Sequence, residues 1–411
     1  MIPGKLITFI LALSLFSVPL AAQQFDWKNY TNKETVTSLA SFAGYVWAAT
    51  TGGVVRLDPD NDSVLTYMNS DGLGSTLINF AAPLGDSIAY FGSTDGVLSR
   101  LRIKTGEFTF AKLQGREGTT ISLNSAVVAG DFLWIASSVG IIKYDLIRHG
   151  GEVKETYRNL GDFPAETAVR DLVVSGGRII AVTAAGLAIA DAASEFLLDP
   201  NEWTTVSAVV NLNCVAVYDD VYVGANTGLY QLLPGPVLQS VGLANAAVLD
   251  LTTASGNTEL FALFNRSGSR GILAYTADQE LPLTGNADAL KNMTALTSNR
   301  GLFVGTSGSG IYGITNNELQ SIEVPGPAAN DLVGGGYSSA GLLHVIARDG
   351  TLSTLSDGDW KRQSITTKEQ LAGIVDRDDN VWICTFGGGV YRLNAANELA
   401  NFTYSNSPLI G

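Results

Sequence analysis

The chain has 411 residues, of which 46% are apolar, 16% are charged and 45 are glycine. This composition excludes a disordered chain, which would combine low hydrophobicity with high charge, and the length allows a few ordinary domains or one repetitive domain. The formal net charge of −14 argues against nucleic acid or an anionic membrane surface as the main partner, because both bind basic faces.

Residues 1–22 are predicted to form a cleaved secretory signal peptide. They carry one positive charge at Lys5, an apolar run over 6–20 and small residues before Gln23, which is the layout of such a signal. The apolar run is short for a membrane anchor, and no cysteine follows it for lipid attachment. We therefore expect an exported protein that keeps no transmembrane helix after signal cleavage.

A two-stranded hairpin recurs nine times after this signal. Each copy joins two strands through a short turn that contains glycine, as in VWAATTGGVVRL (46–57) and VWICTFGGGVYRL (381–393). Glycine is favoured in such turns because they require positive φ. The predicted turn glycines lie 39 to 46 residues apart and are Gly53, Gly96, Gly140, Gly186, Gly228, Gly271, Gly310, Gly350 and Gly389.

Each hairpin is flanked by one more strand on either side, for example 168–176 before it and 359–366 after it. Four short strands in a unit of about 40 residues form the blade of a β-propeller. A solenoid of βα repeats would need a helical apolar period in every unit, and none is present. The sequence thus predicts an all-β fold, with a seven-bladed β-propeller of four-stranded blades over 23–330. The first blades of a second, incomplete propeller are expected over 331–411.

The boundary between these two parts is predicted at the turn-rich segment 324–330. Two blades cannot close a ring and leave a sheet edge exposed, so we expect the natural protein to continue past Gly411. The segment 25–31 resembles the outer strands near Trp203 and Trp360 but has no hairpin before it. It is expected to complete a blade of the first or of the second ring.

The chain offers few residues for catalysis or metal binding. Its two histidines, His149 and His344, lie in different repeats and are interpreted as structural. The segment 308–313 matches GxGxxG, but it forms a hairpin turn rather than the start of a helix, as a dinucleotide site requires. No catalytic, cofactor, metal or ligand-binding residue is therefore assigned, and no cofactor is expected.

Two acidic segments begin like calcium-binding loops. Both lack the glycine expected at the sixth position of an EF-hand loop. They are interpreted as turns, because Asp and Asn side chains bond to their own backbone there. The segments contain Asp58, Asp60 and Asp62, and Asp376, Asp378 and Asn380.

The tryptophans fall into two sets and the cysteines stand alone. Trp47, Trp134 and Trp382 share one hairpin position and are predicted to pack between neighbouring blades. A second set on outer strands leaves sugar stacking open as an alternative, and consists of Trp27, Trp203 and Trp360. Cys214 and Cys384 are too far apart for a CxxC site and are expected to be small buried residues.

The hairpins at 133–146, 221–232, 302–314 and 381–393 resemble the two-component regulator propeller repeat of sensor ectodomains and other exported bacterial proteins. The longer stretch 124–204, and the stretch 27–82, resemble the N-terminal propeller of PorZ-type proteins of the type IX secretion attachment complex. That resemblance implies two seven-bladed propellers and a C-terminal sorting domain, displayed on the surface of a Bacteroidota-type outer membrane. This chain stops before a sorting domain and most of a second propeller.

The same resemblance implies the sortase of the attachment complex and anionic lipopolysaccharide as partners, without a catalytic motif. We therefore expect a non-enzymatic accessory scaffold of type IX secretion, at the cell surface and associated with the outer membrane. The alternative is a glycan-sensing periplasmic ectodomain of a two-component regulator. A propeller lyase or hydrolase is less favoured, because the residues show no acid–base set.

Overall fold

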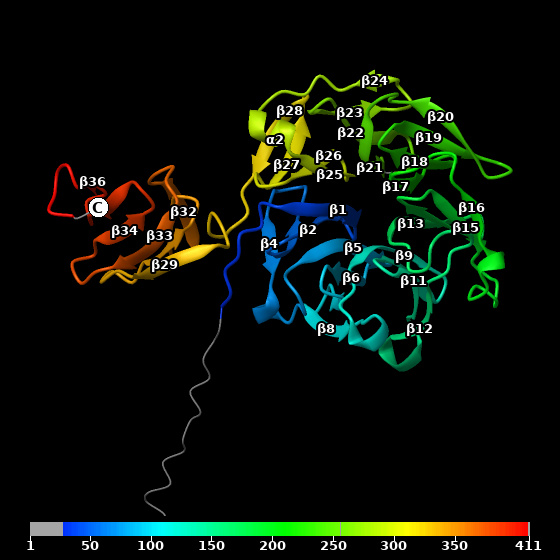
Figure 1. Cartoon of the computed structure of the whole chain (residues 1–411), viewed down its shortest axis with the longest axis horizontal. Helices are drawn as coiled ribbons and strands as arrows, with labels where there is room; N and C mark the ends of the chain where they lie inside the picture. Colours follow the sequence, from blue (N-terminus) through cyan, green and yellow to red (C-terminus); the bar gives the residue numbers. More distant parts are fainter. Residues whose placement is uncertain (1–27, 255, 410–411) are drawn as a thin grey trace, which may run out of the picture.

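The computed structural model describes residues 28–254 and 256–409, and the predicted signal peptide lies outside them. Figure 1 shows a ring of four-stranded blades, coloured blue to yellow along the chain, with a further sheet in orange and red beside it. The predicted all-β fold is confirmed, with seven four-stranded blades in a propeller and two further blade-like units after them.

Each blade of the ring uses four consecutive strands, paired in chain order. Blade 1 contains β1 (Val36–Phe42), β2 (Tyr45–Thr50), β3 (Gly53–Leu57) and β4 (Val64–Tyr67). Blade 2 contains β5 (Ile78–Leu84), β6 (Ile88–Ser93), β7 (Val97–Arg102) and β8 (Glu107–Lys112). Blade 3 contains β9 (Leu123–Ala129), β10 (Phe132–Ser137), β11 (Gly140–Asp145) and β12 (Glu152–Tyr157). Blade 4 contains β13 (Val169–Ser175), β14 (Arg178–Thr183), β15 (Leu187–Asp191) and β16 (Thr204–Val206).

The remaining strands complete the ring and form the C-terminal sheet. Blade 5 contains β17 (Leu212–Val217), β18 (Val221–Ala225), β19 (Gly228–Leu233) and β20 (Val237–Gly242). Blade 6 contains β21 (Ala247–Thr253), β22 (Leu260–Arg266), β23 (Ser269–Ala274) and β24 (Gln279–Glu280). Blade 7 contains β25 (Met293–Ser298), β26 (Leu302–Thr306), β27 (Ile311–Thr315) and β28 (Glu318–Ile322). Blade 8 contains β29 (Leu332–Tyr337), β30 (Leu343–Ala347), β31 (Thr351–Ser356) and β32 (Asp359–Ser364), and blade 9 contains β33 (Gln370–Val375), β34 (Val381–Thr385), β35 (Gly389–Leu393) and β36 (Leu399–Phe402).

Helical structure among the described residues is confined to short connections. The α-helix is α2 (Ala287–Lys291), and Asn286 caps it by accepting hydrogen bonds from two backbone N–H groups. The 3₁₀ turns are η1 (Asn69–Asp71), η2 (Arg116–Gly118), η3 (Arg148–Gly150) and η4 (Pro200–Glu202).

All nine predicted hairpins are present, and eight of the nine predicted turn glycines have positive φ. Gly271 is the exception, because it lies inside β23 opposite Phe264. The turn of that hairpin uses Ser267 and Gly268, with φ of 53° and 88°. The segment holds two glycines three residues apart, so the repeat pattern alone selected the wrong one.

The blades pack through side chains that alternate along the second strand of each blade. Trp47 points toward blade 2 and is buried with Phe91 and Leu101. Trp134 points toward blade 4 and is buried with Leu172 and Ile179. The predicted packing role is confirmed for these two tryptophans. Trp382 lies on the last described blade and is only partly buried, stacked on Phe402.

A ring of side-chain hydrogen bonds joins the blades near the axis. The inner strand of each blade in the ring has a register shift. In every blade of the ring except blade 6, a side chain at that shift reaches the carbonyl at the start of the next inner strand. Six of these bonds measure 2.6–3.0 Å and run from Thr37 to Ile78, Asn79 to Leu123, Asn124 to Val169, Arg170 to Leu212, Asn213 to Val248 and Thr294 to Val36. At the sixth junction, Arg270 of blade 6 donates to the carbonyl of Met293.

The bond from Thr294 to Val36 closes the ring between blade 7 and blade 1. A β-bridge between Thr35 and Ser307 adds to this contact. Both blades have four strands of their own, so residues 28–31 add no strand to this ring, and residues 25–27 of the predicted strand lie outside the described residues. This corrects the expectation from the sequence: residues 28–31 form no strand.

Blades 8 and 9 join differently from the blades of the ring. Their inner strands, β29 and β33, pair in parallel through Gly334 and Gly373, so that one eight-stranded sheet results. A Cβ on Gly334 would lie 2.0 Å from the carbonyl oxygen of Gly373. Glycine therefore permits an approach of two inner strands that side chains prevent in the ring.

Candidate functional site

The histidines do not form a common site. His149 is exposed on η3, and its Nδ1 lies 3.2 Å from Glu152 Oε2. His344 is partly buried on β30, and its Nδ1 lies 3.0 Å from Thr354 Oγ1. Within residues 28–254 and 256–409, no group of three or more His, Cys, Asp or Glu side chains is placed to hold a metal ion.

The two acidic segments are turns, as predicted. Asp58 Oδ1 accepts a hydrogen bond from the backbone N–H of Asp60 at 3.0 Å. Asp376 accepts hydrogen bonds from the backbone of Asp378 and Asn380 and from Trp382 Nε1. These bonds lower the pKa of Asp376 to about 2, and the bond from Trp382 has the largest effect. The match to GxGxxG is also confirmed as a hairpin turn, since Gly308 and Gly310 have positive φ between β26 and β27.

The cysteines and the outer tryptophans differ in exposure. Cys214 is buried, as expected, and desolvation raises the pKa of its thiol. Cys384 is exposed, which corrects the expectation from the sequence, because it lies on the outer face of the last described blade. Trp203 is buried and donates to the Leu197 carbonyl at 2.9 Å, so its ring is not available for sugar stacking. Trp27 lies outside the described residues.

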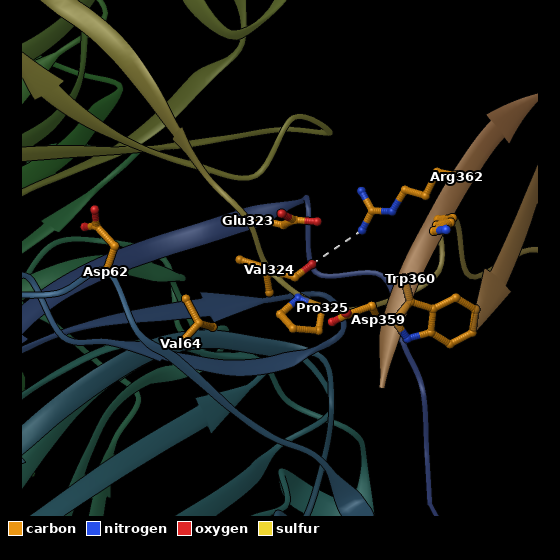
Figure 2. Close-up of a pocket in the computed structure, with 9 residues that line it drawn as sticks. Asp62, Val64, Glu323, Val324, Pro325, Asp359, Trp360 and Arg362 are labelled. Atoms are coloured by element: carbon orange, nitrogen blue, oxygen red, sulfur yellow. Dashed lines mark hydrogen bonds between the residues drawn. The ribbon is translucent and has the colours of Figure 1, made fainter. Parts of the chain in front are cut away.

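Trp360 is the outer tryptophan that faces a cleft, at the joint between the ring and the C-terminal sheet. Figure 2 shows Trp360 and Arg362 on the strand of that sheet, across from Asp62 and Val64 of blade 1. The cleft has a volume of about 640 Å³. Its lining residues are Asp62, Val64, Glu323, Val324, Pro325, Asp359, Trp360, Lys361 and Arg362.

Arg362 fixes the joint by binding the connecting chain. Its Nε and one Nη donate to the Gly326 carbonyl at 3.2 and 3.0 Å, and the same Nη lies 3.5 Å from the Val324 carbonyl. Another Nη forms an ion pair with Glu34, which precedes blade 1. Both ion-pair partners are partly buried, with side-chain exposures of 31% and 27%, and charge-assisted hydrogen bonds of this kind are stronger than neutral ones.

The N-terminal segment holds the other side of the same connection. Asn32 donates from Nδ2 to the carbonyls of Pro327 and Ala328 at 3.0 and 2.6 Å. Asn32 and Asn330 exchange two further bonds. The Tyr30 ring meets the Trp360 ring edge-on, with 5.4 Å between centroids. Residues 30–34 therefore lie between the ring and the C-terminal sheet and contact both.

Lys33 is a buried cation beside this connection. Its side chain donates to the Thr31 carbonyl at 3.1 Å. Desolvation lowers the pKa of Lys33 to about 8, although the nearby charge of Asp71 partly offsets the effect. The ammonium group is consequently held in place rather than presented to the cleft.

The cleft combines an aromatic ring with charges of both signs, and these features suit recognition. Tryptophan and arginine are enriched at the energetic centres of protein interfaces. The sequence identified Trp360 as a possible contact but did not indicate the partners in this cleft, because Tyr30 meets Trp360, and Glu34 and Gly326 meet Arg362, only through folding.

No family model and no curated protein matches this chain. Solved structures do match, and they define its class as a β-propeller protein. PorZ, described as an essential bacterial surface component of the type IX secretion system of Porphyromonas gingivalis, aligns over 92% of this chain with 15% identity and a TM-score of 0.66. The extracellular domain of a putative hybrid two-component system from B. thetaiotaomicron aligns over 90% with 16% identity and a TM-score of 0.52. A GH74 enzyme from Niastella koreensis aligns over 91% of this chain and 73% of its own, with 13% identity and a TM-score of 0.57.

At these low identities, the likeness to solved structures establishes the fold of this chain but not its function, because one fold hosts many functions. The chain spans about half of the first two structures, 53% of each. No helix among the described residues is long and apolar enough to cross a membrane.

Proposed function

We propose that this chain is a non-enzymatic accessory propeller protein of type IX secretion that scaffolds the sortase of the attachment complex. The observation that carries the proposal is the likeness to PorZ, which covers 92% of the chain with a TM-score of 0.66. This likeness therefore extends over the ring and the C-terminal sheet together. Its TM-score exceeds the TM-score of 0.52 for the sensor ectodomain.

The proposed location is the cell surface, in association with the outer membrane, after export through the N-terminal signal. The described similar proteins support this proposal, because one is a bacterial surface component and another an extracellular domain. A periplasmic location is the alternative.

The cleft at the joint is the proposed contact surface for the sortase. Trp360 is partly exposed there, and the fixed connection through Arg362 holds both walls in place without a partner. A surface that is ordered before binding avoids part of the entropic cost of association.

Anionic lipopolysaccharide is the second proposed partner. The net charge of −14 opposes general attraction to an anionic surface, so contact would depend on local cations. Lys361 lines the cleft beside Trp360, and it supplies such a charge.

Binding of the purified chain to the sortase and to vesicles that contain anionic lipopolysaccharide, measured by biolayer interferometry, tests the proposal. We expect both to bind, Trp360→Ala to weaken sortase binding at least about tenfold, and Lys361→Ala to weaken vesicle binding. Phe110→Ala, at a 62% exposed side chain on blade 2, is the matched control and should change neither. Folded wild-type chain that fails to bind the sortase would contradict the scaffold function.

The alternative function is a glycan-sensing ectodomain of a two-component regulator. The likeness to the extracellular sensor domain over 90% of the chain favours it. Free oligosaccharide that binds tightly, together with an absence of sortase binding, would support this alternative.

A further inference from the structure

One position in the blade distinguishes the interface between blades 8 and 9 from every interface of the ring. The position is three residues before the strand partner of the inner-strand residue that directly precedes the register shift, as Trp47 lies three before Thr50, the partner of Val36. In blades 1 to 7 it faces the next blade and holds a large apolar or aromatic side chain. The residues at this position in the nine described blades are Trp47, Tyr90, Trp134, Ile180, Tyr222, Phe261, Phe303, His344 and Trp382.

His344 is the polar member of this set, and polar residues continue across the same face of blade 8. His344 pairs with Thr354, and Thr354 pairs with Lys361, so the three side chains form a row over β30, β31 and β32. In blade 3 the corresponding row begins with Trp134, which pairs with Lys143 on the next strand. The ammonium group of Lys143 lies 4.8 Å from the centroid of the Trp134 ring. In blade 8 no such ring fills the space between the blades.

A cavity of about 710 Å³ lies where that ring would be. Its walls include the His344–Thr354–Lys361 row and Gln363 of blade 8, and Asp379 of blade 9. The large apolar residues of the lining are Leu342, Leu352, Val381 and Leu393. The volume is within the range of about 300–1,000 Å³ that is usual for small-molecule sites.

A second polar substitution occurs at the same interface. Gln370 begins the inner strand of blade 9, where the ring has Val36, Leu123 or Val169. Its side chain is fully buried, and its amide nitrogen and oxygen have no hydrogen-bond partner among the described residues. A buried polar group without a partner is destabilising, so this interface is not optimised for packing alone.

The charged residues of the lining are Lys361, Arg362 and Asp379, and Arg362 is already paired with Glu34, which leaves Lys361 and Asp379 as the two opposite charges of the cavity. Lys361 supplies one cation and Asp379 one anion, and Asp379 accepts hydrogen bonds from the backbone N–H and the hydroxyl of Ser339. These bonds lower the pKa of Asp379. Desolvation lowers the pKa of His344, although the charge of Asp379 partly offsets the effect, and this shift favours the neutral imidazole. The His344 Nδ1 is engaged with Thr354, which leaves Nε2 as its second hydrogen-bonding atom.

We propose that the cavity between blades 8 and 9 is a binding site for a neutral, hydroxyl-rich ligand of sugar size. A hydroxyl group both donates and accepts, so it pairs with Lys361, Asp379, Gln363 and a neutral imidazole alike. A ligand with only negative charge would face Asp379, and one with only positive charge would face Lys361. The apolar wall suits the C–H face of such a ligand. This site does not depend on the proposed scaffold function.

The two histidines of the chain allow a direct test by proton NMR of the full exported chain. The probes are D-galactose and N-acetyl-D-glucosamine, with D-glucuronate and D-glucosamine as charged comparisons. We expect a neutral sugar to shift the His344 ring signals in a saturable manner, while the signals of His149, which is 82% exposed on blade 3, stay unchanged.

Two variants separate a ligand site from a packing defect. His344→Phe restores the ring found at this position in blade 6 or 7, and should keep the unfolding midpoint while sugar binding, followed by saturation-transfer NMR, falls at least about tenfold. Tyr337→Phe, at an exposed side chain of β29, is the control and should bind normally. The proposal is overturned if neither neutral sugar moves the His344 signals, if only a charged probe binds, or if His344→Phe binds as the wild type does.

Discussion

At the scale of single residues, two turn glycines and one buried carboxylate show how backbone geometry and burial decide what a position tolerates. Gly140 has φ of 110°, and a Cβ there would lie 2.1 Å from the Tyr157 carbonyl oxygen. Gly130 has φ of 58° and open space around it. A side chain at position 140 is therefore excluded both by the contact with Tyr157 and by the backbone conformation. At position 130 a side chain is disfavoured by the backbone conformation alone.

Gly140→Ala should destabilise the protein by well over the ~1 kcal/mol that is typical of point mutations, because the β10–β11 turn and the carbonyl of Tyr157 must both move. Gly130→Ala should cost about 1 kcal/mol or slightly more, the ordinary penalty of left-handed backbone. Urea unfolding of the two variants measures the difference. Equal free energies of unfolding would show that the hairpin register around Gly140 is wrong.

Asp250 lies on the inner strand of blade 6 and accepts a hydrogen bond from the Leu296 N–H of blade 7 at 2.7 Å. Desolvation, despite that bond, raises its pKa to about 7. The folded state therefore binds a proton more tightly than the unfolded state, and this group's contribution to stability falls as pH rises from about 4 to about 7.

Asp250→Asn removes this titration while its amide oxygen still accepts from Leu296. Relative to Asp250→Asn, the wild type should be more stable at pH 5 than at pH 8, by about 1 kcal/mol or more over that interval. Urea unfolding at the two pH values measures it, with Asp131→Asn at an exposed carboxylate as control. A difference between wild type and Asp250→Asn that stays constant with pH would contradict the raised pKa.

At the scale of elements, the sequence predicted the repeat well because each blade makes its own hairpins. The alternation around Trp47 and Trp134 is local and was visible directly. The parallel pairing through Gly334 and Gly373 was not, because it depends on which strands meet after folding. The segment 25–31 was assigned to a blade on its likeness to outer strands, whereas Asn32 and Tyr30 place its described end at the joint.

The candidate sites were less predictable than the fold. His344 looked structural from its alternation in a strand, and its difference from Trp47 emerges only when strand partners align the nine blades. Trp360 was noted as a surface tryptophan, but the cleft needs Asp62 and Glu323 from distant segments. Long-range contacts of this kind leave no periodic signal in the sequence.

Closure of the ring should be sensitive to Thr294, whose hydroxyl bridges blade 7 to the Val36 carbonyl at 2.7 Å. Thr294→Val keeps the shape but removes the donor, and should lower the free energy of unfolding by about 1–2 kcal/mol. Thr109→Val, at an exposed position on β8, is the matched control and should change stability much less. Hydrogen exchange should accelerate first in β1 and β25, and acceleration confined to other blades would contradict closure at this junction.

At the scale of the whole molecule, the described residues form a closed ring to which two further blades are fixed by a short connection. Figure 1 shows the C-terminal sheet beside blades 1 and 7, where the chain enters and leaves the ring. Arg362, Glu34 and Asn32 hold this arrangement. The cleft at the joint and the proposed scaffold function both rest on blade 1 belonging to the ring, rather than to a second ring with blades 8 and 9.

A disulfide between blades tests that assignment most directly. Thr35 and Ser307 form a β-bridge, so Thr35→Cys with Ser307→Cys should cross-link on oxidation, since bridge partners satisfy the spacing of a disulfide. Phe386 occupies the equivalent position in blade 9, after Thr385, the partner of Gln370. The comparison variant carries Thr35→Cys with Phe386→Cys. With the exposed Cys384 replaced by serine in both double variants, mass spectrometry of the digests should find the 35–307 disulfide in high yield in the first and no 35–386 disulfide in the second. A 35–386 disulfide, with 35–307 absent, would place blade 1 with blades 8 and 9 and contradict the closed seven-bladed ring.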